Sequence, residues 1–427
     1  MRSLLASPKG KRFTKTVNNV KVTLLCGFIT LLVLRGTMDL GDIQILETDY
    51  SVDFHQDFSA AFRDVNRVLS VLSHVDAEDD DEDEDRDDEE LVSSNATYYS
   101  LGPKVADWDV QMRAWRSLHE PHQEPRILIV TGSSSTPCNN PVGDHLLLKS
   151  IKNKMDYARL HDLQLYYSMV ELDNQLVGFW SKLPLLRKLM LTHPDIEFLW
   201  WIDSAAIFTD MAFEVPIGKY EGFNLILHGW EHEVYEKKAW VGLNTGSFIL
   251  RNCQWSLDLL DAWATMGPKG KVRQDMGSIL SEALDGRPPF EADDQSALIY
   301  LLITQREVWG NKVFLENAYY LHGYWASIVE RYEDLMRFSN NGYGDDRWPF
   351  VTHFVGCEPC GNHADYSKQR CLREMERAFN FGDNQVLEIY GFTHESLSSS
   401  TVKRTERHSA HYPWLSNDNQ MHPNLTS

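Results

Sequence analysis

The sequence predicts an α/β domain built on a Rossmann-like sheet, and three observations support this fold class. A short apolar strand at residues 126–132 ends in a Gly/Ser turn at Gly132, a usual opening of a nucleotide-binding domain. Strand and helix patterns then alternate as far as residue 202, which is typical of parallel strands. The apolar run at 198–211 presents Asp203 where a strand buried on both faces ends. Ligands of such sheets bind beyond the carboxyl ends of the strands.

The remaining elements follow from hydrophobic spacing in chain order. Strand and helix alternate before Asp203, but two strand patterns follow one another after it, so we expect the central sheet to become mixed. The expected helices lie near residues 146–155, 180–189, 256–263 and 294–303, and the other expected strands at 163–167, 224–229, 242–251 and 351–357.

Residues 1–40 predict a membrane anchor. The apolar stretch 22–34 is preceded by six Lys or Arg residues and closed by Arg35. It is shorter than a span of roughly 20 residues, but snorkelling of the flanking cations and extension to residue 40 lengthen it. A cleaved signal peptide and a buried core segment are the alternatives. No small-x-small cleavage site follows, so we favour an uncleaved signal-anchor at 22–40, with a basic cytosolic tail at 1–21 and the rest of the chain in the lumen.

A stem is expected at residues 41–106. Apolar residues repeat at spacings of four and three over 58–72, which predicts either a stem helix that assists dimerisation or an amphipathic helix packed on the domain. The run 76–90 holds 13 acids against Arg86 and predicts an extended spacer. The net charge of −21, without a basic stripe, argues against nucleic acid as a partner. The folded domain is expected at 107–392, followed by a flexible tail at 393–427.

Two further signals fit a luminal location. Asn95 and Asn424 begin N-glycosylation sequons. Five cysteines follow the anchor, which allows at most two disulfides. Cys357 and Cys360 also have the spacing of half a zinc site, although no second closely spaced pair exists, so disulfides are favoured.

Several polar groups are candidates for chemistry. Asp203 offers an oxygen to Mn²⁺ or Mg²⁺, while Ala205 offers none. Asp293, Asp294 and Gln295 open an apolar helix, where one carboxylate serves as the cap and another is left for substrate. The remaining candidates are the cluster His322, Gly323, Tyr324 and Trp325 as a glycan groove, His353 as a metal ligand, Gly356 as a phosphate approach and Asn244 as a sugar contact. Among these, the cluster at 322–325 and His353 have core packing as the alternative.

Long motifs in this chain resemble the plant family of xyloglucan 6-xylosyltransferases and galactomannan galactosyltransferases. The resemblance covers roughly residues 107–392 and is nearer to the xylosyltransferase branch. It is carried by residues 198–211, 228–230, 242–248, 252–257, 291–296, 322–325, 352–357 and 379–385.

The resemblance implies a GT-A fold, a type II protein of the Golgi membrane, and retaining transfer of α-xylose from UDP-xylose to O6 of glucose in a β-1,4-glucan. It implies Mn²⁺ held by Asp203 and His353, and reacting-sugar contacts from Asp293, Asp294 and Gln295. The donor would meet Gly132, Asp203, Ser204, Gly356 and Glu358, and the acceptor would meet Trp230, Asn244 and residues 322–325. An oligomer with itself or with related glycosyltransferases is also expected.

Two residues depart from the family pattern. Ala205 stands where the second Asp of an Asp-x-Asp metal motif is expected, and Glu358 stands where xylosyltransferase members carry Lys. The second change reverses the charge beside the expected diphosphate. These departures leave three hypotheses open, which are a xylosyltransferase with reduced activity, a catalytically impaired partner subunit, and an α-galactosyltransferase acting on mannan. Glu358 acting as a replacement metal ligand is a further possibility.

Overall fold

The computed structural model describes residues 99–119, 125–361 and 366–405. A six-stranded sheet in the order β2-β1-β3-β6-β5-β7 forms its centre. β6 is antiparallel to both of its neighbours, while the β1–β2, β1–β3 and β5–β7 pairs are parallel. The prediction of an α/β domain with a mixed central sheet is therefore confirmed.

The elements fall close to the expected positions. The strands of the central sheet are β1 (Ile127–Gly132), β2 (Gln164–Ser168), β3 (Phe198–Ile202), β5 (Leu225–Gly229), β6 (Leu243–Arg251) and β7 (Val313–Glu316). The main helices are α3 (Trp108–Ser117), α4 (Pro141–Leu160), α5 (Lys182–Thr192), α6 (Gln254–Ala264), α7 (Lys271–Ala283), α8 (Asp294–Thr304), α11 (Tyr332–Phe338) and α12 (Lys368–Ile389), with two four-residue helices, α9 (Arg306–Trp309) and α10 (Trp325–Ile328).

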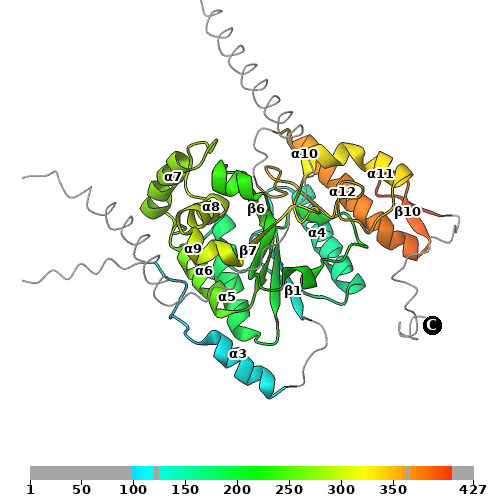
Figure 1. Cartoon of the computed structure of the whole chain (residues 1–427). Helices are drawn as coiled ribbons and strands as arrows, with labels where there is room; N and C mark the ends of the chain where they lie inside the picture. Colours follow the sequence, from blue (N-terminus) through cyan, green and yellow to red (C-terminus); the bar gives the residue numbers. More distant parts are fainter. Residues whose placement is uncertain (1–98, 120–124, 362–365, 406–427) are drawn as a thin grey trace, which may run out of the picture. The chain divides into compact units, whose positions relative to one another are not determined.

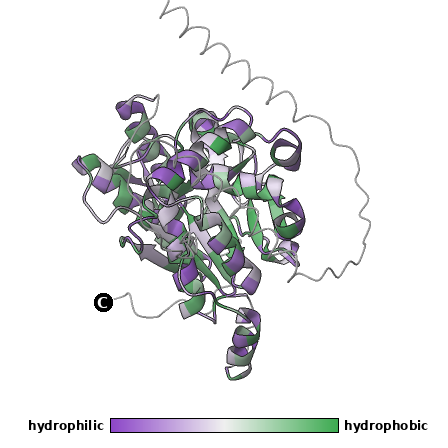
Figure 2. Cartoon of the chain, turned by 90° about the vertical axis from the view of Figure 1, so that its left-hand side faces the viewer, coloured by the Kyte–Doolittle hydropathy of each residue, from purple (hydrophilic) through white to green (hydrophobic). Residues whose placement is uncertain are grey.

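Helices cover both faces of the central sheet (Figure 1), with α5 to α8 on one side and α4 and α12 on the other. Alternate residues of β3 enter different cores. Leu199 and Trp201 pack on the side of α5 and α6, while Trp200 and Ile202 pack with Tyr157 of α4. Figure 2 shows apolar residues concentrated on the strands. Burial on both faces explains why β3 is apolar throughout.

A second sheet begins where β3 ends. The apolar run at 198–211 is not one strand, because residues 203–205 turn the chain and β4 (Ala206–Phe208) joins a three-stranded sheet, β4-β9-β8. This sheet also contains β8 (Gly323–Tyr324) and β9 (Val351–His353). β4 and β9 are antiparallel and pair Ala206 with His353. This pairing brings His353 beside the Asp203 turn, although 150 residues separate them in the sequence.

Helix α4 buries polar residues that the hydrophobic pattern did not single out. Met155 is 45% exposed although it is apolar, whereas Asn153 and Lys154 are buried. The Asn153 side-chain amide donates to the Phe208 carbonyl and accepts from the Phe208 N–H, both at 2.8 Å. The buried polar side of α4 therefore fixes β4 through its backbone.

The C-terminal half of α12 is also buried through polar contacts. Gln385 accepts from the Met211 N–H and donates to the Thr209 carbonyl, both at 2.9 Å. Asn380 donates to the Leu397 carbonyl at 2.8 Å. The polar residues Asn380 and Gln385 of the motif at 379–385 thus hold α12 in place through hydrogen bonds.

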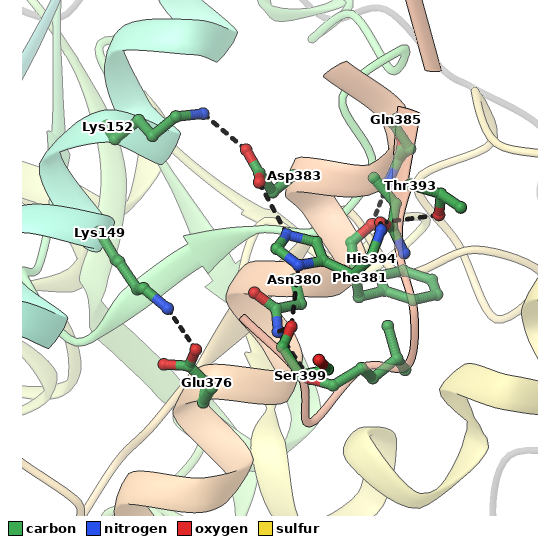
Figure 3. Close-up of polar contacts among 12 residues, drawn as sticks. Lys149, Lys152, Glu376, Asn380, Phe381, Asp383, Gln385, Thr393, His394 and Ser399 are labelled. Carbon is green, nitrogen blue, oxygen red and sulfur yellow. Dashed lines mark hydrogen bonds and ion pairs between the residues drawn. The ribbon is translucent and has the colours of Figure 1, made fainter. Parts of the chain in front are cut away.

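The expectation of a loose tail directly after Phe392 is corrected for residues 393–404. Strands β10 (Phe392–His394) and β11 (Val402–Arg404) pair as an antiparallel hairpin. His394 Nε2 lies 2.9 Å from Asp383 of α12, and its Nδ1 lies 2.9 Å from the Ser399 carbonyl (Figure 3). Asp383 also binds Lys152 of α4 at 2.5 Å. This chain of ionic and polar contacts joins the hairpin to both helices.

Two disulfides hold the segment after β9. Cys138 pairs with Cys360, and Cys357 pairs with Cys371 at the start of α12. Of the five cysteines in the described residues, only Cys253 is free. The bridges confirm the preference for disulfides and remove the zinc alternative, because Cys357 and Cys360 belong to different bridges.

Several predictions fall on residues outside the described ranges. These are the anchor at 22–40, nearly all of the stem, the acidic spacer, and the sequons at Asn95 and Asn424. Among the helices that the structure describes, none is both long enough and apolar enough to span a bilayer.

Candidate functional site

Asp203 lies directly beyond β3, where the sequence predicted chemistry. Its N–H donates to the Gly246 carbonyl of β6 at 2.8 Å. Its two carboxylate oxygens have different surroundings. Oδ1 accepts from Trp201 Nε1 at 2.6 Å and lies 3.7 Å from Lys182 Nζ, while Oδ2 lies 3.5 Å from His353 Nε2. The protein thus holds one oxygen and turns the other toward His353.

Asp203 and His353 have the geometry of two ligands of one divalent ion. Bonds of about 2.1 Å to a common ion, at an angle of roughly 110°, separate two ligand atoms by about the observed distance. Burial lowers the pKa of His353 to about 4, so its imidazole is neutral and able to coordinate. A Cβ at Gly246 would lie 2.8 Å from Asp203 Oδ2, so glycine keeps this space open.

A third protein ligand is not assembled around this pair. The only group of three possible ligands that converge within the described residues is Cys138, Asp144 and Cys360, whose two sulfurs form a disulfide. Mn²⁺ and Mg²⁺ bind through one or two carboxylates and take further ligands from water and substrate phosphates. The pair fits such an ion, with the remaining positions left to a donor diphosphate.

Ala205 contributes only apolar packing. It is 7% exposed and lies in a cluster with Ile207 and Phe354. Its carbonyl accepts from the Phe354 N–H at 3.0 Å. The turn therefore keeps its backbone hydrogen bond but offers the candidate metal site no second carboxylate oxygen.

Two buried residues of α4 support the turn from below. Ser150 Oγ donates to the Ser204 carbonyl at 2.6 Å, and Lys154 Nζ donates to Ser150 Oγ and to the Ala206 carbonyl, both at 2.7 Å. Burial lowers the pKa of Lys154 to about 7, although the Asp203 charge acts in the opposite direction. Ser204, expected at the donor, is thus fixed through its backbone carbonyl.

Lys182 joins Asp203 to helix α8. This fully buried residue donates to Asp294 Oδ2 at 2.8 Å and to the Thr245 carbonyl at 3.0 Å. Burial lowers its pKa, but the charges of Asp203 and Asp294 outweigh that effect and leave the pKa raised. Thr245 Oγ1 also donates to Asp294 Oδ2 at 2.8 Å.

Neither carboxylate at the start of α8 is free. Asp293 caps the helix by accepting from the Ser296 N–H at 2.8 Å, and it pairs with Arg287 at 3.0 Å. Asp294 is only 4% exposed and bound to Lys182. The prediction that one acid serves as the cap is confirmed. The expectation that the other faces substrate is corrected, because it is committed to a buried ion pair.

Gln295 is the half-buried polar side chain beside this pair. Its Oε1 accepts from Asn244 Nδ2 at 2.9 Å, and its Nε2 donates to the Trp240 carbonyl at 3.0 Å. Asn244 Oδ1 in turn accepts from the Gly246 N–H at 2.8 Å. Gln295 is therefore linked through Asn244, another expected sugar contact, to the glycine that borders Asp203.

Two further buried histidines, His322 and His228, extend from the candidate metal pair in the other direction. The ring centroids of His353 and His322 are 5.0 Å apart, and those of His322 and His228 are 5.7 Å apart. Burial lowers the pKa of His228 to about 4 and that of His322 well below its ordinary value. Each ring has one nitrogen without a hydrogen-bond partner within the described residues. Trp230 packs edge-on against His228, with centroids 4.8 Å apart.

The predicted glycan cluster at 322–325 divides into different roles. Tyr324 is 41% exposed, and its hydroxyl contacts that of Tyr366. Trp325 is fully buried and stacked on Phe354, so core packing is its role and its assignment to the acceptor is corrected. A Cβ at Gly323 would lie 2.5 Å from the Val351 carbonyl, so this glycine permits the close approach of β8 to β9.

The other residues that were expected to bind the sugar-nucleotide donor lie at the ends of loops. A Cβ at Gly132 would lie 2.8 Å from the Ser168 carbonyl, so this glycine allows β1 and β2 to approach. Gly356 has a φ of 76°, which favours glycine. Glu358 follows it between the two disulfide-bonded cysteines. Burial raises the pKa of Glu358, and the Asp203 charge raises it further.

Comparisons with known proteins identify the family of this chain. The galactosyl transferase GMA12/MNN10 family matches residues 123–364, more than half of the chain. The chain belongs to this family. Xyloglucan 6-xylosyltransferase 1 of Arabidopsis thaliana is 51% identical over 92% of this chain and 91% of its own length. Xyloglucan 6-xylosyltransferase 2 of the same plant is 50% identical over 94% and 92%. The resemblance noted in the sequence is thus confirmed.

Among solved structures, a glycosyltransferase involved in the glycosylation of the major capsid of PBCV-1 has a TM-score of 0.35 and 14% identity. The match covers 55% of this chain and 96% of that one.

Two residues of the site, Lys182 and His228, were not predicted from the sequence, although a pattern indicated each of them. Lys182 precedes the apolar positions Leu185, Leu186 and Leu189 at spacings of three, four and seven, which placed it on the buried face of α5. His228 sits near the end of the apolar strand β5, just as Asp203 follows β3. A polar residue at the end of a buried strand was therefore the signal for both His228 and Asp203.

Proposed function

We propose that this protein transfers α-xylose from UDP-xylose to O6 of glucose in a β-1,4-glucan, with retention, as a GT-A enzyme of xyloglucan side-chain synthesis. The observation that carries the proposal is the continuous array from Trp230 through His353 and Asp203 to Gln295. It is reinforced by about 50% identity to relatives named xyloglucan 6-xylosyltransferases. A type II topology in the Golgi membrane belongs to the same proposal and follows from the predicted anchor at 22–40.

Each residue of the array has a physical task. Asp203 Oδ2 and His353 Nε2 would hold Mn²⁺, which neutralises charge on the departing diphosphate. Trp201 and Lys182 hold the opposite oxygen of Asp203 and so fix the direction of its free oxygen. Gln295 and Asn244 orient each other beside this centre and provide amide groups for sugar hydroxyls.

The carboxylates of α8 favour same-face attack over a covalent intermediate. A carboxylate nucleophile must be exposed to the reacting carbon. Asp293 is engaged with its helix and Arg287, and Asp294 is engaged with Lys182. Each would have to leave a charged or capping partner before attacking. We therefore assign both a positioning role, with the leaving phosphate taking the acceptor proton.

Ala205 and Glu358 support a second candidate, in which the protein is a catalytically impaired partner of related glycosyltransferases. Ala205 removes one metal oxygen, and Glu358 places a negative charge that interacts with Asp203 at the expected diphosphate site. Both changes weaken donor binding, whereas the fold and the acceptor side are retained. Such a protein would act through assembly with an active subunit.

One experiment separates the candidates. The purified full chain is incubated with Mn²⁺, with UDP-xylose or UDP-galactose, and with cello- or manno-oligosaccharides. The double variant Ala205→Asp, Glu358→Lys is tested in parallel. Glu307→Lys, which repeats the charge change of Glu358→Lys on the exposed surface of α9, is the control.

The outcomes differ for each candidate. Mn²⁺-dependent xylosylation of cello-oligosaccharides by the unmodified chain supports the xylosyltransferase and excludes the impaired partner. Turnover by the double variant alone supports the impaired partner. Galactosylation of manno-oligosaccharides would contradict both candidate functions and identify a mannan galactosyltransferase. Inactivity of both the unmodified chain and the double variant would refute the proposed donor.

A further inference from the structure

Two aromatic rings stand at the surface beside Gln295. Phe290 is 41% exposed and Trp240 is half-buried, with ring centroids 6.2 Å apart and planes at 70°. Val241, next to Trp240, is 58% exposed and extends the apolar surface. Together these residues form an aromatic platform, which has no role in the array described above.

Arg287 supports the Phe290 ring of the platform. Its side chain is fully buried, and its guanidinium carbon lies 3.9 Å from the Phe290 ring centroid. The same guanidinium donates to the Phe290 and Glu291 carbonyls at 3.2 and 2.9 Å. A buried cation and its hydrogen bonds to the loop therefore fix an apolar ring in an exposed position. A rigid exposed ring loses little entropy on binding a ligand.

The platform is continuous with the candidate site. The Trp240 carbonyl accepts from Gln295, and Gln295 is bonded to Asn244, whose side chain binds the N–H of Gly246. Gly246 borders both Asp203 and His353. A molecule lying across the platform would therefore extend from the edge of the reaction centre.

We propose that Trp240 and Phe290 bind one glucosyl ring of a β-1,4-glucan acceptor, next to the ring that receives the transferred sugar. This inference rests on the proposed function. A glucosyl ring has apolar C–H faces that pack on aromatic rings and a rim of hydroxyls that needs polar partners. The amide of Gln295 and the exposed carboxylate of Glu291 provide such partners at the platform edge. The arginine is buried, so it is not available to recognise an anionic polymer.

The test compares Phe290→Ala and Trp240→Ala with Phe338→Ala, which removes an 80% exposed ring from α11. Calorimetry on the full chain with Mn²⁺ and UDP measures the affinity for cellohexaose, and a separate titration measures UDP. Aromatic packing contributes about 1 kcal/mol, so each platform variant should bind cellohexaose roughly fivefold to tenfold more weakly. UDP affinity should not change, and Phe338→Ala should match the unmodified chain. Phe290→Ala removes an exposed ring, so this variant tests the platform even if Trp240→Ala unfolds.

Three results would overturn the inference. Unchanged cellohexaose affinity in Phe290→Ala, while the unmodified chain binds, would refute the platform and leave the proposed function standing. Failure of the unmodified chain to bind cellohexaose, with UDP bound normally, would refute both the glucan acceptor and this subsite. Loss of self-association in Phe290→Ala with glucan binding intact would assign the platform to a second copy of the chain.

Discussion

The buried ammonium of Lys182 offers the sharpest test of the site's electrostatics. Replacing it with methionine keeps most of the side-chain volume and removes the charge between Asp203 and Asp294. Asp294 then stays buried without its cation and retains only the Thr245 hydroxyl on Oδ2. We expect Lys182→Met to destabilise the fold, because removing one partner of a buried ion pair leaves the other uncompensated.

The size of the effect follows from the burial. Lys182 is 2% and Asp294 is 4% exposed, so solvent cannot replace the lost partner. Breaking such a pair costs about 3–5 kcal/mol of unfolding free energy. The double variant Lys182→Met, Asp294→Asn removes both charges and should recover about 2 kcal/mol or more. The difference between the effect of the double variant and the sum of the effects of the two single variants measures the interaction between Lys182 and Asp294.

The pH dependence has a defined sign. Burial raises the pKa of Asp294, and Lys182 opposes this rise. Without Lys182, the folded chain holds a proton on Asp294 more tightly than the unfolded chain does. The variant therefore loses stability as pH rises above the ordinary carboxyl pKa of about 4 and regains it on acidification.

Urea unfolding of the full chain at pH 5 and pH 7 measures both effects, with Lys269→Met, an exposed lysine nearby in the loop before α7, as the control. The reasoning would be refuted if Lys182→Met lost less than about 1 kcal/mol at pH 7. It would also be refuted if its pH dependence equalled that of the unmodified chain.

Three further predictions concern other parts of the site and fold. Gly246→Ala should lower the free energy of unfolding by about 1–3 kcal/mol and abolish detectable Mn²⁺ binding in a titration, because its Cβ would crowd the candidate ligands. Gly218→Ala, which places a Cβ in open space, should do neither. His394→Ala should cost about 1–3 kcal/mol in chemical unfolding and increase protease cleavage after residue 392, since it leaves Asp383 without one charged or polar partner; unchanged cleavage would contradict the role of this contact. Lys154 has a folded pKa of about 7 against 10.5 ordinarily, so the unfolded chain holds more protons between these values. Its contribution to the unfolding free energy should therefore rise with pH there, by up to about 1.4 kcal/mol per unit, and Lys154→Met should lack this rise.

Local patterns predicted most of the fold because they report burial directly. The run Phe198–Ile202 has apolar residues at every position, which is typical of a strand covered on both faces. One acid of the pair at 293 and 294 was expected to cap α8, and Asp293 does so, because an acid before an apolar helix satisfies the first N–H groups. The same patterns predicted helix α4 but missed the burial of Asn153 and Lys154, since these polar residues form hydrogen bonds to β4, a strand distant in sequence.

The candidate site was predicted in part, since single residue types do not reveal their partners. His353 was ambiguous in sequence because a histidine on an apolar strand is usually a core residue. Its role depends on the antiparallel pairing of β4 with β9, which sets it opposite Ala206. Trp325 and Tyr324 are neighbours with the same composition signal, yet one is fully buried and the other exposed. Only the packing of α10 separates them.

The sequence alone determined that this chain is an α/β protein with an acid at the end of its most apolar strand, and that the acid two residues further on is missing. The fold class and the placed acid follow from hydrophobic periodicity and residue chemistry, which are local, and the missing acid follows from the resemblance to the family pattern. Tertiary structure decided that the carboxylate of Asp203 is shared between His353 and Lys182, and that Asp294 is bound and not free. Such assignments depend on contacts between residues 21, 112 and 150 positions apart, whose distances no local pattern encodes.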